Sequence, residues 1–283
     1  MEISRPEGAA AFLEVAGPLL ERDEARNQLP LAIASTLAVH PQAYDVVRFW
    51  VALDGDRPLA AALRTEPHNL VLADPEPGAE LDALLAAVLA DDPGVPGIVG
   101  NEPAVDAAAS LLAAPGGRSA ERVLDQGVYA LTWVEDVPRA AGAHRRADES
   151  DRPLLLDWFV AFEKEALPHH DSDVAAHERV LDTRFSSERA GLWLWEDGGV
   201  PVSMAGFSGQ TPTGIRVGPV YTPPSHRRRG YGTTLVADLS QWLLGQGYRW
   251  CFLYTDLSNP TSNHVYETIG YRQVAEAVEY RFT

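Results

Sequence analysis

The 283-residue chain is poor in cysteine, in long apolar runs and in positive charge. Its one cysteine, Cys251, excludes an internal disulfide framework and a cysteine-rich metal site. Cys251 lies in the apolar run 250–254, which predicts a buried strand, so we expect its thiol to pack in the core and not to act as a nucleophile. No window approaches the roughly 18 uninterrupted apolar residues of a membrane-spanning helix. We therefore expect no membrane partner.

Positive charge is scarce because 23 Lys and Arg face 40 Asp and Glu, for a formal net charge of −17. This balance argues against nucleic acid or anionic lipid as a partner, since both require a basic face. An anionic ligand must then be held locally, and residues 226–229 form the densest basic cluster. The first residues lack a basic region followed by an apolar stretch, so no secretory signal is visible and we expect a cytoplasmic location.

The basic cluster opens a turn that runs into an amphipathic helix. Residues 227–232 read Arg-Arg-Arg-Gly-Tyr-Gly, and the strand predicted before them, 214–222, ends at two prolines. Gly230 and Gly232 let the backbone fold closely around a charged group. The start of the helix adds unpaired N–H groups and the positive end of its dipole. The sequence therefore predicts a cradle for a pyrophosphate between a strand and a helix.

A short pattern occurs twice in the chain at one common offset. Trp50, Asp54, Gly55 and Pro58 recur as Trp193, Asp197, Gly198 and Pro201, and each set reads as a hairpin with an Asp-Gly turn. Such hairpins also arise by chance, but the shared offset favours a tandem duplication. We expect domains over residues 1–136 and 137–283, with a linker at 136–142. Both halves mix predicted helices and strands, so the fold class is mixed α/β (α+β).

The first domain lacks the cradle. At the corresponding place, residues 74–80 are rich in Asp and Glu and would repel a phosphate. We therefore expect the ligand to bind in the second domain alone.

Three segments of the second half resemble the GNAT superfamily, the acyl-CoA-dependent N-acyltransferases. They are Val220-Tyr221-Thr222, the turn Arg227-x-x-Gly230-x-Gly232, and an asparagine-rich turn that leads to Tyr266 and Ile269-Gly270-Tyr271. The resemblance implies tandem GNAT-like domains, each a mostly antiparallel mixed sheet flanked by helices. It also implies that acetyl-CoA binds in the second domain, while the first is a degenerate copy that walls the acceptor pocket.

The same resemblance assigns the site residues. Backbone groups of the strand end would bind the pantetheine arm, and amides of the turn would bind the pyrophosphate. The implied cofactor-binding residues are Val220, Tyr221, Thr222, Arg227, Arg228, Arg229, Gly230, Tyr231, Gly232, Thr233, Asn259 and Asn263. Pro219 fits a place where strand pairing is interrupted, because proline cannot donate to a sheet ladder. Asn259 and Asn263 have an alternative role as turn and N-cap residues.

Catalysis is assigned by the resemblance to Tyr266 and Val220. The tyrosine would protonate the departing thiolate, and the Val220 amide would polarise the thioester carbonyl and stabilise the oxyanion. Without the resemblance, Tyr266 would be an ordinary half-buried tyrosine at a helix–sheet junction.

A general base is missing from the motif. The acceptor amine must lose a proton before it attacks, yet the strand 214–222 has no Asp or Glu, where many family members carry a glutamate. The candidates are Glu163, Glu165, His169, His170 and Asp171, each of which also suits a solvated face or a helix end. Adjacent histidines also raise the question of a metal, but no distant ligand cluster matches them, so we expect none.

The sequence thus predicts an N-acetyltransferase that moves an acetyl group from acetyl-CoA to a primary amine of a small molecule or peptide, by direct attack in a ternary complex. We expect a monomer or homodimer. The acidic balance favours a cationic acceptor, although net charge describes the surface and not the pocket. One alternative is a non-catalytic acyl-CoA-binding regulatory module, and another is a protein that uses the cradle for ATP.

Overall fold

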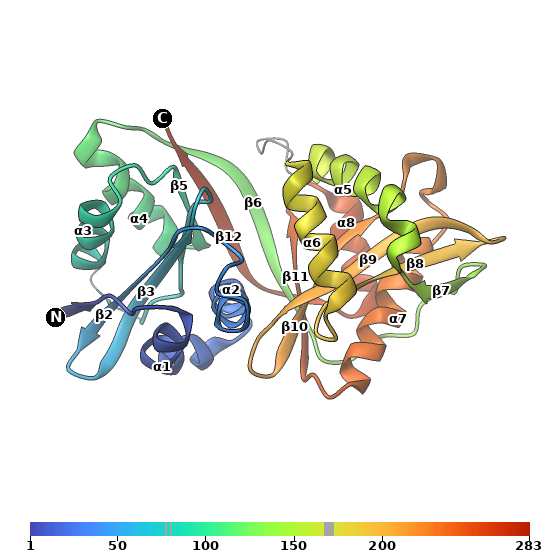
Figure 1. Cartoon of the computed structure of the whole chain (residues 1–283), viewed down its shortest axis with the longest axis horizontal. Helices are drawn as coiled ribbons and strands as arrows, with labels where there is room; N and C mark the ends of the chain where they lie inside the picture. Colours follow the sequence, from blue (N-terminus) through green and yellow to red (C-terminus); the bar gives the residue numbers. More distant parts are fainter. Residues whose placement is uncertain (77, 80, 167–172) are drawn as a thin grey trace.

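The computed structural model describes residues 1–283 with the exception of 77, 80 and 167–172. The chain forms two lobes that lie side by side, with helices covering both faces of the strands (Figure 1). In the described residues, one twelve-stranded sheet runs through both lobes. The predicted mixed α/β class is confirmed.

The two halves repeat one order of elements. The first half contains β1 (Glu2–Ser4), α1 (Ala9–Leu20), α2 (Gln28–Val39), β2 (Val47–Asp54), β3 (Arg57–Thr65), β4 (Leu70–Leu72), α3 (Asp82–Asp91), β5 (Gly97–Asn101), α4 (Ala104–Ala113) and β6 (Ala120–Leu131). The second half contains β7 (Ala143–Arg146), α5 (Arg152–Ala166), α6 (Val174–Ser186), β8 (Gly191–Asp197), β9 (Val200–Gln210), β10 (Gly214–Tyr221), α7 (Tyr231–Gly245), β11 (Trp250–Asp256), α8 (Pro260–Ile269) and β12 (Arg272–Phe282). Short 3-10 turns lie at Glu21–Asp23, Ala114–Gly116, Glu149–Asp151 and Pro224–His226.

The sheet joins the halves through an exchange of strands. Its order is β1-β2-β3-β4-β5-β12-β6-β11-β10-β9-β8-β7, so β12 lies between β5 and β6, and β6 lies between β12 and β11. Figure 1 shows β12 beside β6 at the centre, with the C-terminus in the lobe of the first half. Each half therefore receives a strand from the other. The proposed boundary at 136/137 stays a prediction, because β12 serves both halves.

Most neighbouring strands are antiparallel. The parallel pairs are β4 with β5 and β10 with β11, at equivalent places in the two halves. The predicted hairpins are present: Asp54 pairs with Arg57 and Asp197 with Val200. In each turn the glycine after the aspartate has a φ of 61°, a left-handed conformation that glycine adopts without steric cost.

Core side chains fill the spaces between the sheet and the helices. In the second half, α7 and α8 pack on one face and α5 and α6 on the other. Cys251 lies on the α7 face and is 0% exposed, and burial raises the pKa of its thiol to about 12. The prediction of a core cysteine is confirmed. Among the described residues, no helix combines the length and apolar content needed to span a bilayer.

One strand is longer than the sequence indicates. The largely apolar run 128–133 predicts a strand that starts at 128, but β6 begins at Ala120. Its first residues are largely exposed or half-buried and pair with β12 along the full strand. Pairing with a distant strand, and not a local apolar pattern, extends β6.

Candidate functional site

Strands β10 and β11 separate partway along their length. They pair at Gly214, Ile215 and Arg216, opposite 250–252, and at no later position. Beyond Arg216, β10 follows β9 alone, with a register shift between Val217 and Val220, while β11 pairs with β6 up to Asp256. Both strands therefore leave backbone groups unpaired on the sides that face each other. The interrupted pairing implied by the resemblance is present, and Pro219 lies in it.

The turn after β10 presents a row of free amides. The first hydrogen bond of α7 runs from the Thr234 amide to the Gly230 carbonyl, at 2.9 Å. Among the described residues, the amides of 228–233 donate to no protein acceptor. Arg228 and Gly230 have φ values of 62° and 80°, a left-handed geometry in which glycine at 230 avoids strain. Free amides and the helix dipole make this turn a site for an anion.

Side chains from β8 and β9 fix the cradle. The Tyr231 hydroxyl donates to Asp197, and Ser203 Oγ lies 2.8 Å from Thr222 Oγ1. A Cβ at Gly232 would lie 3.2 Å from Thr222 Oγ1, a tight contact that glycine avoids. The start of α7 is therefore held close to the end of β10.

The Arg227 side chain helps to hold the cradle in place and does not lie on its open side. Its Nε donates to the Thr222 carbonyl at 2.8 Å, and Nη2 lies 2.6 Å from Glu165 Oε2 on α5. The side chains of Arg228 and Arg229 are exposed and form no ion pair in the described part of the chain. A contribution of all three residues to cofactor binding stays a prediction.

Tyr266 lies on α8 with its ring edge-on to Tyr271, at a centroid distance of 5.9 Å. It borders the same core as Val220. Its hydroxyl has no hydrogen-bond partner in the described residues, and burial raises its pKa to about 12. The phenol therefore keeps its proton at neutral pH and can donate it.

The two asparagines near Tyr266 make local contacts. Asn259 Oδ1 accepts from the Ser262 amide at 3.2 Å, which caps α8. Asn263 accepts from Thr255 Oγ1 at 2.9 Å and donates to the Leu257 carbonyl at 3.3 Å. These contacts match the alternative turn and N-cap roles. Contact with a cofactor stays a prediction for both.

The comparisons with known proteins agree with this geometry. Residues 152–271, which span β10, the turn, α7 and α8, match the model of the Acetyltransferase (GNAT) family. Residues 152–271 therefore form a domain of the GNAT family. Solved structures with the same fold include a GNAT-family acetyltransferase from Colwellia psychrerythraea, at 13% identity and a TM-score of 0.59 over 100% of both chains.

Two further GNAT structures are similar over most of this chain. A GCN5-related N-acetyltransferase from Sphaerobacter thermophilus shares 17% identity with a TM-score of 0.61, covering 99% of this chain and 95% of the other. A tandem GNAT protein from the clavulanic acid biosynthesis pathway shares 14% identity with a TM-score of 0.61, covering 99% and 98%. At these identities the likeness concerns the fold. No curated protein matches the chain.

Within the GNAT domain, the described base candidates have partners. Glu165 pairs with Arg227, and Glu163 Oε1 lies 2.9 Å from Nε2 of His177, a buried residue of α6. No motif in the sequence singles out His177, because only the packing of α6 on α5 brings it to Glu163. His169, His170 and Asp171 lie outside the described residues. In the part that is described, no group of three potential metal ligands occurs.

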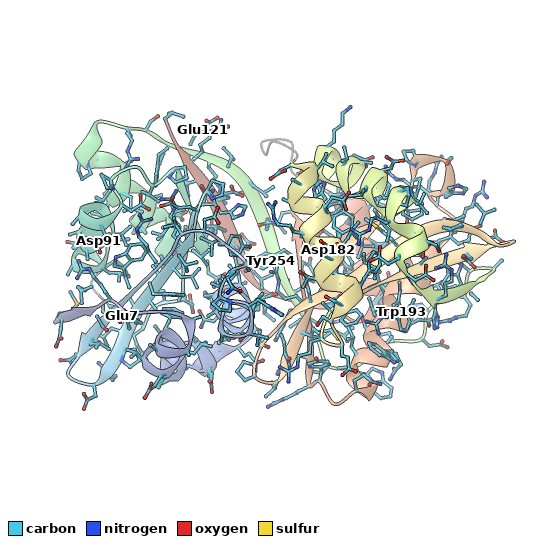
Figure 2. The ribbon with its side chains drawn as sticks, viewed as in Figure 1. Glu7, Asp91, Glu121, Asp182, Trp193 and Tyr254 are labelled. Atoms are coloured by element: carbon cyan, nitrogen blue, oxygen red, sulfur yellow. The ribbon has the colours of Figure 1, made fainter. Side chains whose placement is uncertain are left out.

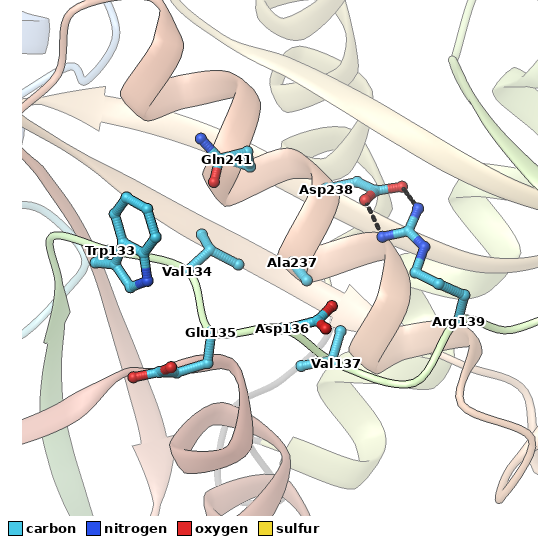
Figure 3. Close-up of a pocket in the computed structure, with 9 residues that line it drawn as sticks. All are labelled: Trp133, Val134, Glu135, Asp136, Val137, Arg139, Ala237, Asp238 and Gln241. Carbon is cyan, nitrogen blue, oxygen red and sulfur yellow. Dashed lines mark hydrogen bonds and ion pairs between the residues drawn. The ribbon is translucent and has the colours of Figure 1, made fainter.

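A separate hollow of about 440 Å³ lies between α7 and the segment after β6. Figure 3 shows Trp133, Glu135 and Asp136 on that segment, with Arg139 paired to Asp238. The hollow faces the middle of α7, away from the free amides at its start.

The segment 132–142 contains no helix or strand, as expected for the predicted linker. It is nevertheless attached to α7, because the Ala140 amide donates to Thr234 Oγ1 at 3.0 Å.

Proposed function

We propose that the second half of the chain binds acetyl-CoA and catalyses transfer of the acetyl group to a primary amine. The observation that supports this most directly is the row of free amides at 228–233, located where β10 has separated from β11. Free amides at a helix start bind a diphosphate without requiring a basic surface. The separated strand β10 exposes its backbone to an extended arm that contains amides. The GNAT match covers both features.

Acetyl-CoA, when bound, supplies the acyl group as a thioester. The amides of 228–233 would hold its diphosphate, and the backbone of 220–222 its pantetheine arm. The Val220 amide would donate to the carbonyl oxygen as negative charge develops there. Tyr266 would hold a proton at its hydroxyl for the sulfur that leaves, and its raised pKa keeps that proton in place until then.

The first half would serve as a wall of the acceptor site and not as a second donor site. Its segment between β4 and α3 carries Asp74 and Glu76, which pair with Arg26 and Arg22. The first half therefore has carboxylates held in ion pairs at the place where the second half has free amides. The cytoplasmic location, and the monomeric or dimeric state, stay predictions.

A titration followed by a turnover assay tests the proposal. Acetyl-CoA binding is measured by calorimetry on the full chain, and thiol release is then followed with a panel of primary amines. We expect binding, and turnover with at least one class of amine. Binding without turnover on any amine would instead favour the regulatory module, and tighter binding of ATP than of coenzyme A would favour a nucleotide site.

A further inference from the structure

Two arginines lie beside the point where β10 leaves β11, and among the described residues neither is paired with a carboxylate. Arg216 is the last residue of β10 that pairs with β11. Its Nε is buried without a partner, and in the described residues its guanidinium forms no hydrogen bond or ion pair. The guanidinium carbon lies 5.3 Å from the centroid of the Tyr254 ring.

The second arginine is Arg184 of α6, which lies behind Arg216. Its guanidinium donates to the carbonyls of Gly191, Phe207 and Gly218, each at 3.0 Å, and its Nε has no partner. Neutral carbonyls fix its position but leave its charge uncompensated. Arg64 offers a contrast, because it is 7% exposed like Arg184 and pairs with Asp92.

The two positive charges act on each other and on their neighbours. Burial lowers the pKa of Arg184 to about 10, with a further contribution from Arg216, so it stays charged at neutral pH. Burial lowers the pKa of Arg216 as well. A buried charge without a counter-ion is unfavourable, and bound anions relieve it. Two neighbouring arginines with uncompensated charge are distinctive in a chain that has 40 acidic residues.

Arg216 points to the side of the sheet away from α7 and α8. Ile215 and Val217 pack in the core under those helices, and alternation along the strand places Arg216 on the opposite face. There its Cδ is 3.4 Å from a Cβ built at Gly209, a position that also contacts Ala32 of α2. Figure 2 shows Tyr254, its ring neighbour, at the junction of the two lobes.

The first half of the chain extends to the surroundings of Arg216 and is hydrogen-bonded to the second half there. Glu24 accepts from the Thr213 amide at 2.8 Å and from Thr213 Oγ1 at 2.6 Å, which ties the first half to the β9–β10 hairpin. Burial raises the pKa of Tyr44, and the charge of Arg216 opposes that shift, so this phenol of the first half also lies near the guanidinium. Both halves therefore border Arg216.

We propose that Arg216 binds a carboxylate of the acceptor and that Arg184 is the positioning residue behind it, which makes the acceptor an amino acid or a peptide with a free carboxylate. This proposal rests on the proposed acetyl transfer. A guanidinium presents two parallel N–H groups that match the two oxygens of a carboxylate. Arg216 is at the vertex of the strand separation, so a carboxylate bound there would lie beside the reacting end of the site. A cationic acceptor, which the net charge favours, would be repelled.

The test compares acids with their amides. Amino acids and dipeptides, each with its C-terminal amide, serve as acceptors for the full chain and for Arg216→Gln. We expect the wild type to prefer the acid by about tenfold or more in kcat/KM, because the amide cannot form the paired hydrogen bonds that a carboxylate forms with the half-buried guanidinium. Arg216→Gln should remove this preference by raising KM of the acid far more than KM of the amide. Arg216→Lys, which keeps the charge but loses the fork, should restore it in part.

Arg249→Gln is the matched control. Arg249 also lies over an aromatic ring, Trp250 at 5.4 Å, and has no ion pair in the described residues, but it is exposed and precedes the first residue of β11. It should leave the preference intact. If Arg216→Gln does not fold, the ratio of acid to amide in the wild type still decides the matter.

The outcomes separate this proposal from the proposed function. Acetylation of amines with no preference for acids, or with a preference for polyamines or phosphorylated amines, overturns the carboxylate site and leaves the acetyltransferase standing. If no amine is acetylated, calorimetry of the same acids and amides with the CoA-bound chain decides it. Acids that bind tighter than their amides in the wild type, but not in Arg216→Gln, support the site, and equal or absent binding overturns it.

Discussion

At the scale of single residues, the site combines groups whose roles follow from their surroundings. Tyr266 has a free hydroxyl and a raised pKa, whereas Arg227 is engaged with Thr222 and Glu165. The sequence motif indicated the identity of these residues but not which of them are free to act. Arg216 and Arg184 could not be predicted, because their lack of counter-ions among the described residues arises from the packing of α6 and both lobes on one strand.

Removal of the Tyr266 hydroxyl tests the proton donor. Tyr266→Phe should lower kcat by roughly 10²-fold or more, as expected for loss of a general acid, with an unchanged Kd for acetyl-CoA. Tyr248→Phe is the control, because Tyr248 borders the same core and also has no hydrogen bond in the described residues. If the two variants turn over at similar rates, Tyr266 is not the acid.

The pH profile provides a second check on Tyr266. Its pKa is raised above the ordinary 10, so its protonated form persists to higher pH, and the acid is available throughout the neutral range. The rate should rise with pH as the acceptor amine loses its proton, with no loss of activity from Tyr266 below about pH 10. A fall in kcat between pH 7 and 9 in a stable enzyme would contradict the assignment.

At the scale of elements, local patterns predicted the helices well and strand lengths less well. The apolar face of Leu155, Trp158, Phe159 and Phe162 predicts a helix over 152–166, and α5 spans Arg152–Ala166. The glycine turn predicts the start of α7. The first residues of β6 have no apolar pattern and become a strand by pairing with β12. Contacts between distant segments therefore account for what the sequence did not indicate.

The turn before α7 depends on glycine at 230. Gly230→Ala should raise the Kd for acetyl-CoA by roughly tenfold, because alanine disfavours a φ of 80° and would move the free amides. Gly247→Ala, at the other end of α7, meets the same strain at a φ of 98° with open space around its Cβ. It should lower thermal stability to a similar extent and leave the Kd unchanged. Equal effects on binding would show that strain, and not the cradle, is responsible.

At the scale of the whole molecule, the shared sheet couples the halves. Val278 of β12 is 1% exposed and packs in the core of the first half, although it lies near the end of the chain. The repeated Asp-Gly hairpins predicted two related halves, but no local pattern could reveal that each half receives a strand from the other. The lobe of the second half is therefore not an independent sheet.

A substitution in β12 should weaken the first half. Val278→Ala should reduce the free energy of unfolding by about 2 kcal/mol and lower hydrogen-exchange protection in β5, because it leaves a cavity beneath that strand. Val274→Ala, on the same strand but 39% exposed, should change stability by less than about 0.5 kcal/mol. Loss of protection confined to the second half would contradict the coupling.

The central claim is that the free amides at the start of α7 bind the diphosphate of acetyl-CoA. Amide-resolved NMR of the full chain during titration with acetyl-CoA tests it most directly. We expect the largest shifts at 228–233, and these shifts should saturate with the calorimetric Kd. Saturable binding that leaves these amides unchanged would contradict it.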